Sequence, residues 1–338
     1  MPETNGPDLE SIATEKQHVE KATTLPEHVF ASAHDVADYI DALEGAEITP
    51  ELKEAVKTQM TEAIASIEEK YGTNGEGAKP FHDRDHTLEV ISDAIRTFDI
   101  VAQAMPHLQL TGKDKLLTII AAGYHDIEQD QPGQNEVQSG ELCEQAMNKH
   151  PDLFSTEDVT KTKSMIGATT YNFKNHQQAL TNPDTPLAEL TDKKAVIERV
   201  VAGADFGGLG FFDRQWWRGN RLAKEILPPD KSFDPAESLF TNIQRLETWF
   251  EGQKKFLHDH IVYTKKIYGT DLAHAIHPHL EDSYKLYDAV ERHIAHIKDS
   301  VATQPGSFSN ADLERFMSTD PIVIGQIKEE LGLTLGSL

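Results

Sequence analysis

The chain has 338 residues, 38% of them hydrophobic and 26% charged, which suits one large domain or a core domain with an appendage. Its formal net charge of −24 argues against non-specific binding to nucleic acid or to an anionic membrane. The single cysteine, Cys143, excludes an intramolecular disulfide and any zinc site built on two or more cysteines. We expect a cytoplasmic protein, because the acidic N-terminus lacks a signal-peptide pattern and no stretch approaches the length of a membrane span.

Helical patterns dominate the chain after a polar beginning. Residues 1–28 contain three prolines and no apolar period, so we expect them to be disordered. Apolar residues then recur at helical spacing, with Ser32, Thr49-Pro50 and Ser155 or Thr156 as helix starts. The predicted helical segments are 32–43, 49–67, 85–98, 116–126, 135–147, 155–166, 193–205, 211–226, 240–257 and 280–297.

No run of alternating apolar and polar residues indicates a strand, so the predicted fold class is all-α. The prolines at 228 and 229 interrupt the helical pattern. We therefore predict a helical domain at 29–229 and a helical extension at 230–338 that is packed on it or appended to it.

A histidine and an aspartate, His125-Asp126, close an apolar run that begins at Leu116. An imidazole beside a carboxylate at the end of a buried segment makes a good metal-binding pair. Taken alone, such a pair more often marks the end of a helix. Two other residues change that balance, since His86 extends the apolar face of one predicted helix and Asp205 ends another.

The best four candidate metal ligands are therefore His86, His125, Asp126 and Asp205. Two imidazoles and two carboxylates suit one divalent metal ion of the group Mn, Fe, Co, Ni, Zn or Mg better than copper(I). Such a centre can polarise a phosphoryl oxygen and activate water, which together suffice for hydrolysis.

In this order the fragments resemble the HD-domain superfamily of metal-dependent phosphohydrolases, whose signature is a helix-borne histidine, a His-Asp pair and a distant aspartate. The resemblance covers residues 80–225 and extends to three longer stretches. These are Phe81-His-Asp-Arg-Asp-His86, Gln134-Asn-Glu-Val-Gln-Ser139 and Ala204-Asp-Phe-Gly-Gly-Leu-Gly210. One departure is Gly203, which stands where the similar predicted phosphohydrolases have an aspartate. The resemblance implies an HD-like helical bundle that hydrolyses a small-molecule phosphate ester, such as a nucleotide or a cyclic nucleotide.

Two residues are candidates for catalysis. Glu136 lies in the matched Asn-Glu stretch and is preferred to Glu128 and Asp130 for orienting or deprotonating the attacking water. His82 lies one helical turn before His86, where it can contact substrate. For each of them, an ordinary solvent-facing residue explains the sequence about as well.

Three arginines are candidates for binding the substrate phosphate: Arg84, Arg214 and Arg218. The last two lie on a basic stripe at helical spacing, and Arg218 is preferred because it follows two tryptophans whose packing can orient it. A solvated basic face explains the same stripe.

Two alternatives remain open from the sequence. A di-iron oxygenase of similar fold requires His150 and His176 to enter the pocket, although the loop-like surroundings of both favour one metal ion. A non-catalytic helical module would keep the metal for stability and bind a partner through the extension after 230. No oligomeric state is predicted.

Overall fold

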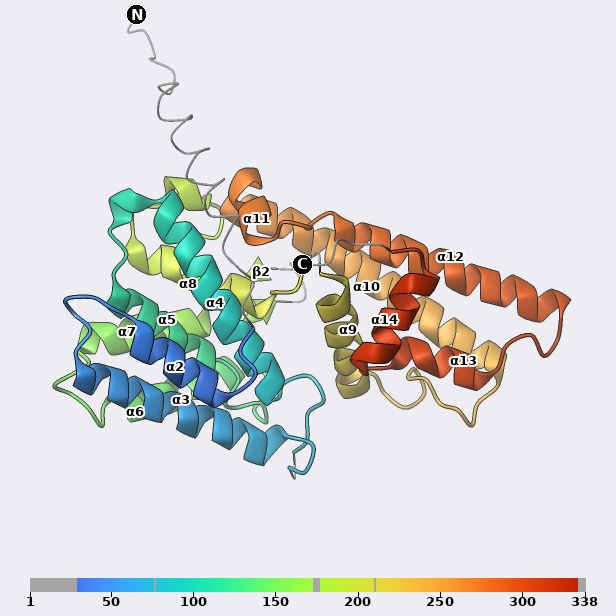
Figure 1. Ribbon diagram of the computed structural model, residues 1–338, viewed down its shortest axis with the longest axis horizontal. Coiled ribbons are helices and arrows are strands. Elements are labelled where there is room, and N and C mark those ends of the chain that lie inside the picture. The colour runs from blue at the N-terminus through green and yellow to red at the C-terminus, as the bar shows by residue number, and fades with distance from the viewer. Residues whose placement is uncertain (1–28, 76, 173–176, 210, 334–338) are drawn as a thin grey trace, which may run out of the picture. The chain divides into compact units, whose positions relative to one another are not determined.

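A computed structural model describes residues 29–75, 77–172, 177–209 and 211–333 (Figure 1). The predicted disordered segment, 1–28, lies outside these residues. The described part of the chain is helical with very little strand, which confirms the all-α prediction.

The chain divides into two compact units, and the predicted domains 29–229 and 230–338 stay predictions. Of the described residues, the first unit contains those within 29–78, 82–207 and 263–278, and the second those within 79–81, 208–262 and 279–333.

The first unit is a bundle of α-helices (Figure 1). Its helices are α2 (Ala33–Ala42), α3 (Pro50–Tyr71), α4 (Arg84–Ala104), α5 (Gly112–Tyr124), α6 (Asn135–Met147), α7 (Thr156–Gly167), α8 (Lys193–Asp205) and α11 (Thr270–Ile276), with 3₁₀ turns η1 (Pro106–Leu108) and η2 (Leu187–Glu189).

Helix α5 is the centre of this unit. It contacts α3, α4, α6, α7 and α8, and every residue from Leu116 to Tyr124 is buried. Apolar side chains on all sides of this segment predict such a central position, because each side has a helix to pack against. The end of α5 therefore lies in the interior of the bundle.

Several predicted helix starts are confirmed by their caps. The side chains of Ser32, Thr49 and Ser155 accept hydrogen bonds from the backbone N–H groups of Asp35, Leu52 and Asp158. Each bond satisfies one of the donors that a helix leaves unpaired in its first turn.

The all-α prediction has one small exception among the described residues. Strands β1 (Tyr171–Asn172) and β2 (Gln177–Gln178) pair antiparallel, with Tyr171 opposite Gln178. Segments of two residues are too short to show an alternating pattern, so the sequence could not indicate them.

The second unit contains α9 (Phe212–Ile226), most of α10 (Leu239–Tyr268), α12 (Asp282–Thr303), α13 (Asn310–Glu314), η3 (Arg315–Met317) and α14 (Pro321–Glu330). Trp216 of α9 is buried and stacks on Phe250 of α10, with ring centroids 5.3 Å apart. The side-chain amide of Asn220 donates to the carbonyl oxygens of Phe316 and Ser318. The ring contact joins α9 to α10, and the two hydrogen bonds join α9 to η3 and the residue after it.

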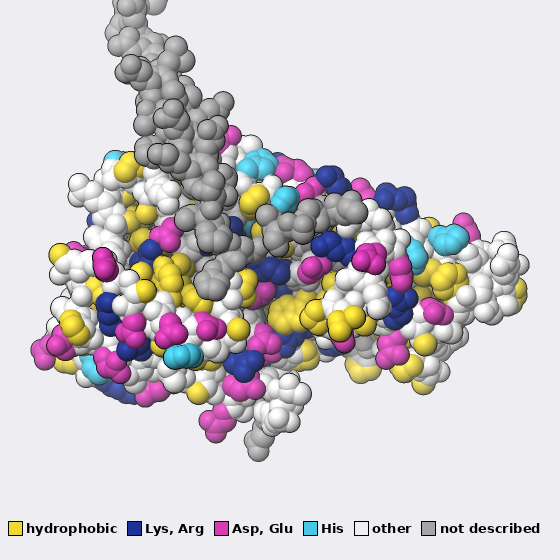
Figure 2. Space-filling model, viewed as in Figure 1, with side chains coloured by type: hydrophobic (Ala, Val, Ile, Leu, Met, Phe, Trp, Pro, Cys, Tyr) yellow, Lys and Arg dark blue, Asp and Glu magenta, His cyan; other side chains and the backbone are white. Residues whose placement is uncertain are grey.

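Acidic side chains lie along the surface of α2 and α3 (Figure 2). The side chains of Asp38, Asp41, Glu54, Glu62 and Glu68 are each more than half exposed. Part of the excess negative charge thus faces solvent on these two helices. Within the described chain, no helix is both long enough and apolar enough to cross a bilayer.

Candidate metal centre

His86 lies in the first turn of α4, where a cap fixes the backbone. The Asp83 carboxylate accepts hydrogen bonds from the backbone N–H groups of Asp85 and His86, at 3.0 and 3.2 Å. The His86 side chain is fully buried, as its place on the apolar face predicts.

His125 and Asp126 directly follow the last residue of α5. The carbonyl groups of a final helical turn lack partners within the helix, and the Ala122 carbonyl oxygen accepts a hydrogen bond of 2.7 Å from Nδ1 of His125. This bond places the proton of a neutral imidazole on Nδ1 and leaves the lone pair of Nε2 available to a metal ion.

Asp205 is the last residue of α8, and two nearby glycines allow close packing there. A Cβ atom on Gly207 would overlap the carboxylate of Asp93, and one on Gly203 would overlap the hydroxyl oxygen of Tyr268. The departure from the resembled family at Gly203 therefore has a packing cause, since an aspartate side chain does not fit beside Tyr268.

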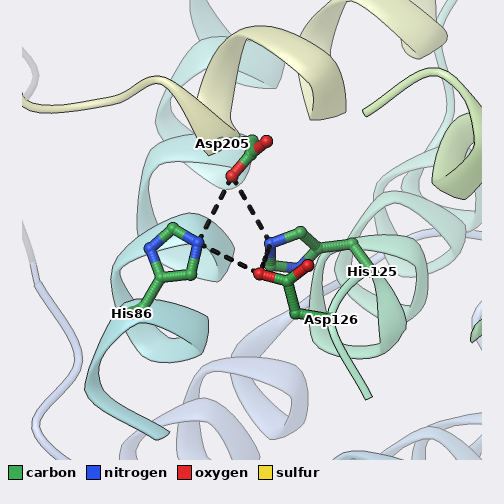
Figure 3. A group of neighbouring side chains, drawn as sticks. All are labelled: His86, His125, Asp126 and Asp205. Carbon is green, nitrogen blue, oxygen red and sulfur yellow. Dashed lines mark ion pairs between the residues drawn. The ribbon is translucent and has the colours of Figure 1, made fainter. Parts of the chain in front are cut away.

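These elements bring all four predicted ligands together (Figure 3). One ligand atom from each of His86, His125, Asp126 and Asp205 lies within 4.8 Å of the others. From Nε2 of His86, the distance to the nearest oxygen is 3.3 Å for both Asp126 and Asp205. From Nε2 of His125 these two distances are 3.0 and 3.6 Å.

The separations fit a single bound cation. Nitrogen and oxygen ligands at roughly 2.0–2.2 Å from a metal, set at tetrahedral or octahedral angles, lie roughly 3.0–3.6 Å from one another. Nε2 of His125 lies near one oxygen of Asp126 and one of Asp205. It nevertheless forms no hydrogen bond with any of the described residues. The donor set and its spacing are therefore those of a site that can hold a metal ion.

Burial and charge point to the same conclusion. The side chains of His86 and His125 are at most 1% exposed, whereas those of Asp126 and Asp205 are 11% and 20% exposed, so the small solvent exposure of the group lies on its carboxylate side. Burial alone would lower the pKa of His125, but the two carboxylates outweigh it and raise that pKa well above its usual value. Burial would raise the pKa values of both aspartates, yet the imidazoles lower them. The pocket thus favours a positive charge at its centre.

The two predicted catalytic residues lie in the same unit as the centre. Glu136 is in the first turn of α6, and its pKa is raised by burial and by the negative charges of Asp126 and Asp205. The rings of His82 and His86 are 5.9 Å apart and perpendicular. These positions leave both catalytic assignments as predictions.

The predicted phosphate-binding arginines occupy different settings. Arg84 pairs with Asp85 at 3.0 Å and with Glu68 at 4.0 Å, so its guanidinium is engaged within α3 and α4. Arg214 and Arg218 belong to α9 in the second unit, where Arg218 is buried. Their role as phosphate ligands stays a prediction.

Glu128 and Asp130, the less favoured candidates for activating water, are engaged with α3. Lys70 pairs with their carboxylates at 2.9 and 3.2 Å. Burial works against the charged form of Glu128, but the Asp130 N–H and Lys70 outweigh it and lower its pKa. These acids anchor the loop after α5.

Sequence reasoning missed Gln129. Its side-chain amide donates a hydrogen bond of 2.7 Å to Oδ1 of Asp126. The available signal was its position three residues after Asp126, which a turn brings within reach of the carboxylate.

The group of four ligands does not include the histidines that a six-ligand centre requires. His150 is half-buried after the end of α6 and is not part of the group formed by the described residues. His176 lies outside those residues, so the di-iron alternative gains no support.

Comparisons with protein-family models, with curated proteins and with solved structures find no match to this chain.

Proposed function

We propose that this protein is a metal-dependent phosphohydrolase of the HD type, which cleaves a small-molecule phosphate ester with water activated at one divalent metal ion. The observation that carries the proposal is the convergence of His86, His125, Asp126 and Asp205 from the start of α4, the residues after α5 and the end of α8. Their order along the chain is that of the resembled superfamily. The ligands were predicted from separate stretches of the sequence, and they lie at distances suited to a cation. This supports the hypothesis that the stretches together form one signature.

The bound cation would polarise a phosphoryl oxygen and make water at the centre more acidic, which is the chemistry that ester hydrolysis needs. The protein's own contribution is a fixed set of ligands, with His125 oriented through Ala122 and the imidazole side closed to solvent. Substrate and water would approach from the carboxylate side, where Asp205 is the most exposed of the four.

Glu136 and His82 are assigned separate roles in this proposal. Burial and the negative charges of the centre act to raise the pKa of Glu136. A carboxylate with a raised pKa is suited to accept the proton from attacking water. His82, beside His86, suits a hydrogen bond to the departing ester oxygen. Arg84, which belongs to the same unit as the centre, would help to offset the phosphate charge, and the roles of Arg214 and Arg218 stay predictions.

Metal content and turnover test the proposal together. Wild type, His125→Ala and Asp126→Ala are purified, loaded with Mn²⁺, Zn²⁺ or Co²⁺, and measured for bound metal by mass spectrometry. Hydrolysis is followed by chromatography of the products on a panel of nucleotides, cyclic nucleotides and other phosphoesters. We expect the wild type to hold one metal ion per chain and to hydrolyse at least one phosphoester of the panel, and each variant to lose both properties.

His150→Ala is the matched control, because it removes a half-buried histidine outside the ligand group. It should retain metal and activity, and a loss in this variant would favour the six-ligand alternative. A wild type that binds no divalent metal contradicts the proposal. A wild type that binds metal, gains melting temperature and cleaves no phosphoester is the non-catalytic module instead.

A further inference from the structure

The two oxygens of Asp126 have different surroundings. Oδ2 faces the metal centre, at 3.0 Å from Nε2 of His125 and 3.3 Å from Nε2 of His86. Oδ1 accepts a hydrogen bond of 2.7 Å from the side-chain amide of Gln129. One oxygen is thus directed at the ligand group and the other is held away from it.

The orientation of the Gln129 amide follows from a chain of hydrogen bonds. The backbone N–H of Gln131 can only donate, and it donates to Oδ1 of Asn135 at 2.9 Å. The other end of the Asn135 amide is therefore its NH₂ group, which donates to Oε1 of Gln129 at 3.3 Å. This leaves the NH₂ group of Gln129 facing Asp126, so a backbone donor sets the direction of the whole chain.

Backbone contacts hold the same loop in place. The N–H of Gln129 donates to the Tyr71 hydroxyl at 2.7 Å, and Tyr71 is 1% exposed at the end of α3. The N–H of Glu128 donates to the hydroxyl of Ser139 in α6 at 3.2 Å. Gln129 is thus supported from α3 and α6 and is a fixed donor.

We propose that Gln129 is a positioning residue, which occupies Oδ1 of Asp126 and so presents this carboxylate to the metal through Oδ2 alone. The inference rests on the metal centre of the proposed function. It assigns Asn135, the first residue of the Asn-Glu stretch, the task of orienting Gln129. A carboxylate released from Gln129 is able to turn and offer both oxygens, which changes the number and geometry of the ligands.

The test compares wild type with Gln129→Met, which keeps the length of the side chain but removes the amide. Two properties are measured: the Kd for Mn²⁺ by calorimetry, and the visible absorption of the Co²⁺-loaded protein, which reports ligand number and geometry. We expect the Kd to rise about 10- to 100-fold, as is typical when a residue supporting a metal ligand is removed. The Co²⁺ spectrum should change as well.

Two further variants make the test specific. Gln134→Met is the matched control, because the amide of Gln134 is exposed in the same loop and donates only to the Gly133 carbonyl among the described residues. It should leave the Kd and the spectrum unchanged. Asn135→Asp retains the acceptor for the Gln131 N–H but cannot donate to Gln129, so it should change both readouts in the same direction as Gln129→Met.

The metal-free melting temperature of each variant shows whether it folds. If Gln129→Met is unfolded, Asn135→Asp carries the test. Wild-type Kd and spectrum in a folded Gln129→Met overturn the positioning role while the metal centre stands. A wild type that binds neither Mn²⁺ nor Co²⁺ overturns the proposed function and this role with it.

Discussion

Gly203→Ala is a test of the packing that places Asp205. Gly203 lies within α8, two residues before Asp205. In an exposed helix the same substitution stabilises a protein by about 0.5–1 kcal/mol, because alanine restricts the unfolded chain more than glycine does. At Gly203 we expect the opposite sign.

The reason is the side chain of Tyr268. A Cβ atom at 203 would overlap its hydroxyl oxygen and lie 2.8 Å from Cζ. Tyr268 is 2% exposed, and its hydroxyl donates to the Arg199 carbonyl at 2.5 Å. Overpacking costs about 1–3 kcal/mol of stability, and a buried group that loses its hydrogen-bond partner costs about 1–3 kcal/mol more. After the gain from alanine is subtracted, the free energy of unfolding should fall by about 1–5 kcal/mol.

Urea denaturation followed by circular dichroism measures the change in the free energy of unfolding. Gly252→Ala in α10 is the control, because Gly252 is exposed and a Cβ there meets nothing within 4 Å among the described residues. It should be neutral or stabilising. In the Gly203→Ala, Tyr268→Phe double variant, part of the loss should return because the overlapping hydroxyl is gone. If Gly203→Ala stabilises as much as Gly252→Ala, the packing argument is wrong.

Two further predictions concern other buried groups. The Asp158 carboxylate accepts hydrogen bonds from Lys113 at 2.7 Å and from the Ser155 N–H at 2.8 Å. Burial alone would raise the pKa of this carboxyl group, but the hydrogen bonds outweigh burial and lower the pKa below 3.8. Because the folded pKa is lower than the unfolded one, this stabilisation is complete above pH 3.8 and is lost as pH falls through the folded pKa. Asp158→Asn should therefore cost about 1–2 kcal/mol at pH 7 and less below pH 3.8 in urea titrations, whereas an equal cost at every pH would refute the assignment. Cys143 is fully buried, which raises the pKa of its thiol. A disulfide reagent should therefore modify this thiol only after denaturation. Fast modification of the native protein would contradict the buried position.

Much of the helical structure could be predicted from local patterns. The apolar run before His125 predicts a helix surrounded on all sides, and α5 is that helix. Capping residues such as Thr49 mark helix starts because their side chains bond to N–H groups only two or three positions away. Such interactions involve neighbours in the sequence, so the sequence alone reveals them.

The candidate ligands could also be selected from the sequence. The apolar face on which His86 lies is an unusual place for a polar residue, and burying this side chain requires a compensating partner. The order of the fragments supplied the hypothesis that they share one site. In the structure the four side chains lie together, with one ligand atom from each within 4.8 Å of the others, and their role as metal ligands stays a prediction.

Contacts between distant segments were beyond the reach of local patterns. The need for glycine at 203 comes from Tyr268, which is 65 positions away along the chain, and the anchoring of Gln129 comes from Tyr71. Neither pairing has a periodic or local signature, because each depends on how whole helices pack. Local chemistry therefore determined which residues could form helices and ligate a cation, and only tertiary packing decided which oxygen of Asp126 faces the centre and what holds it there.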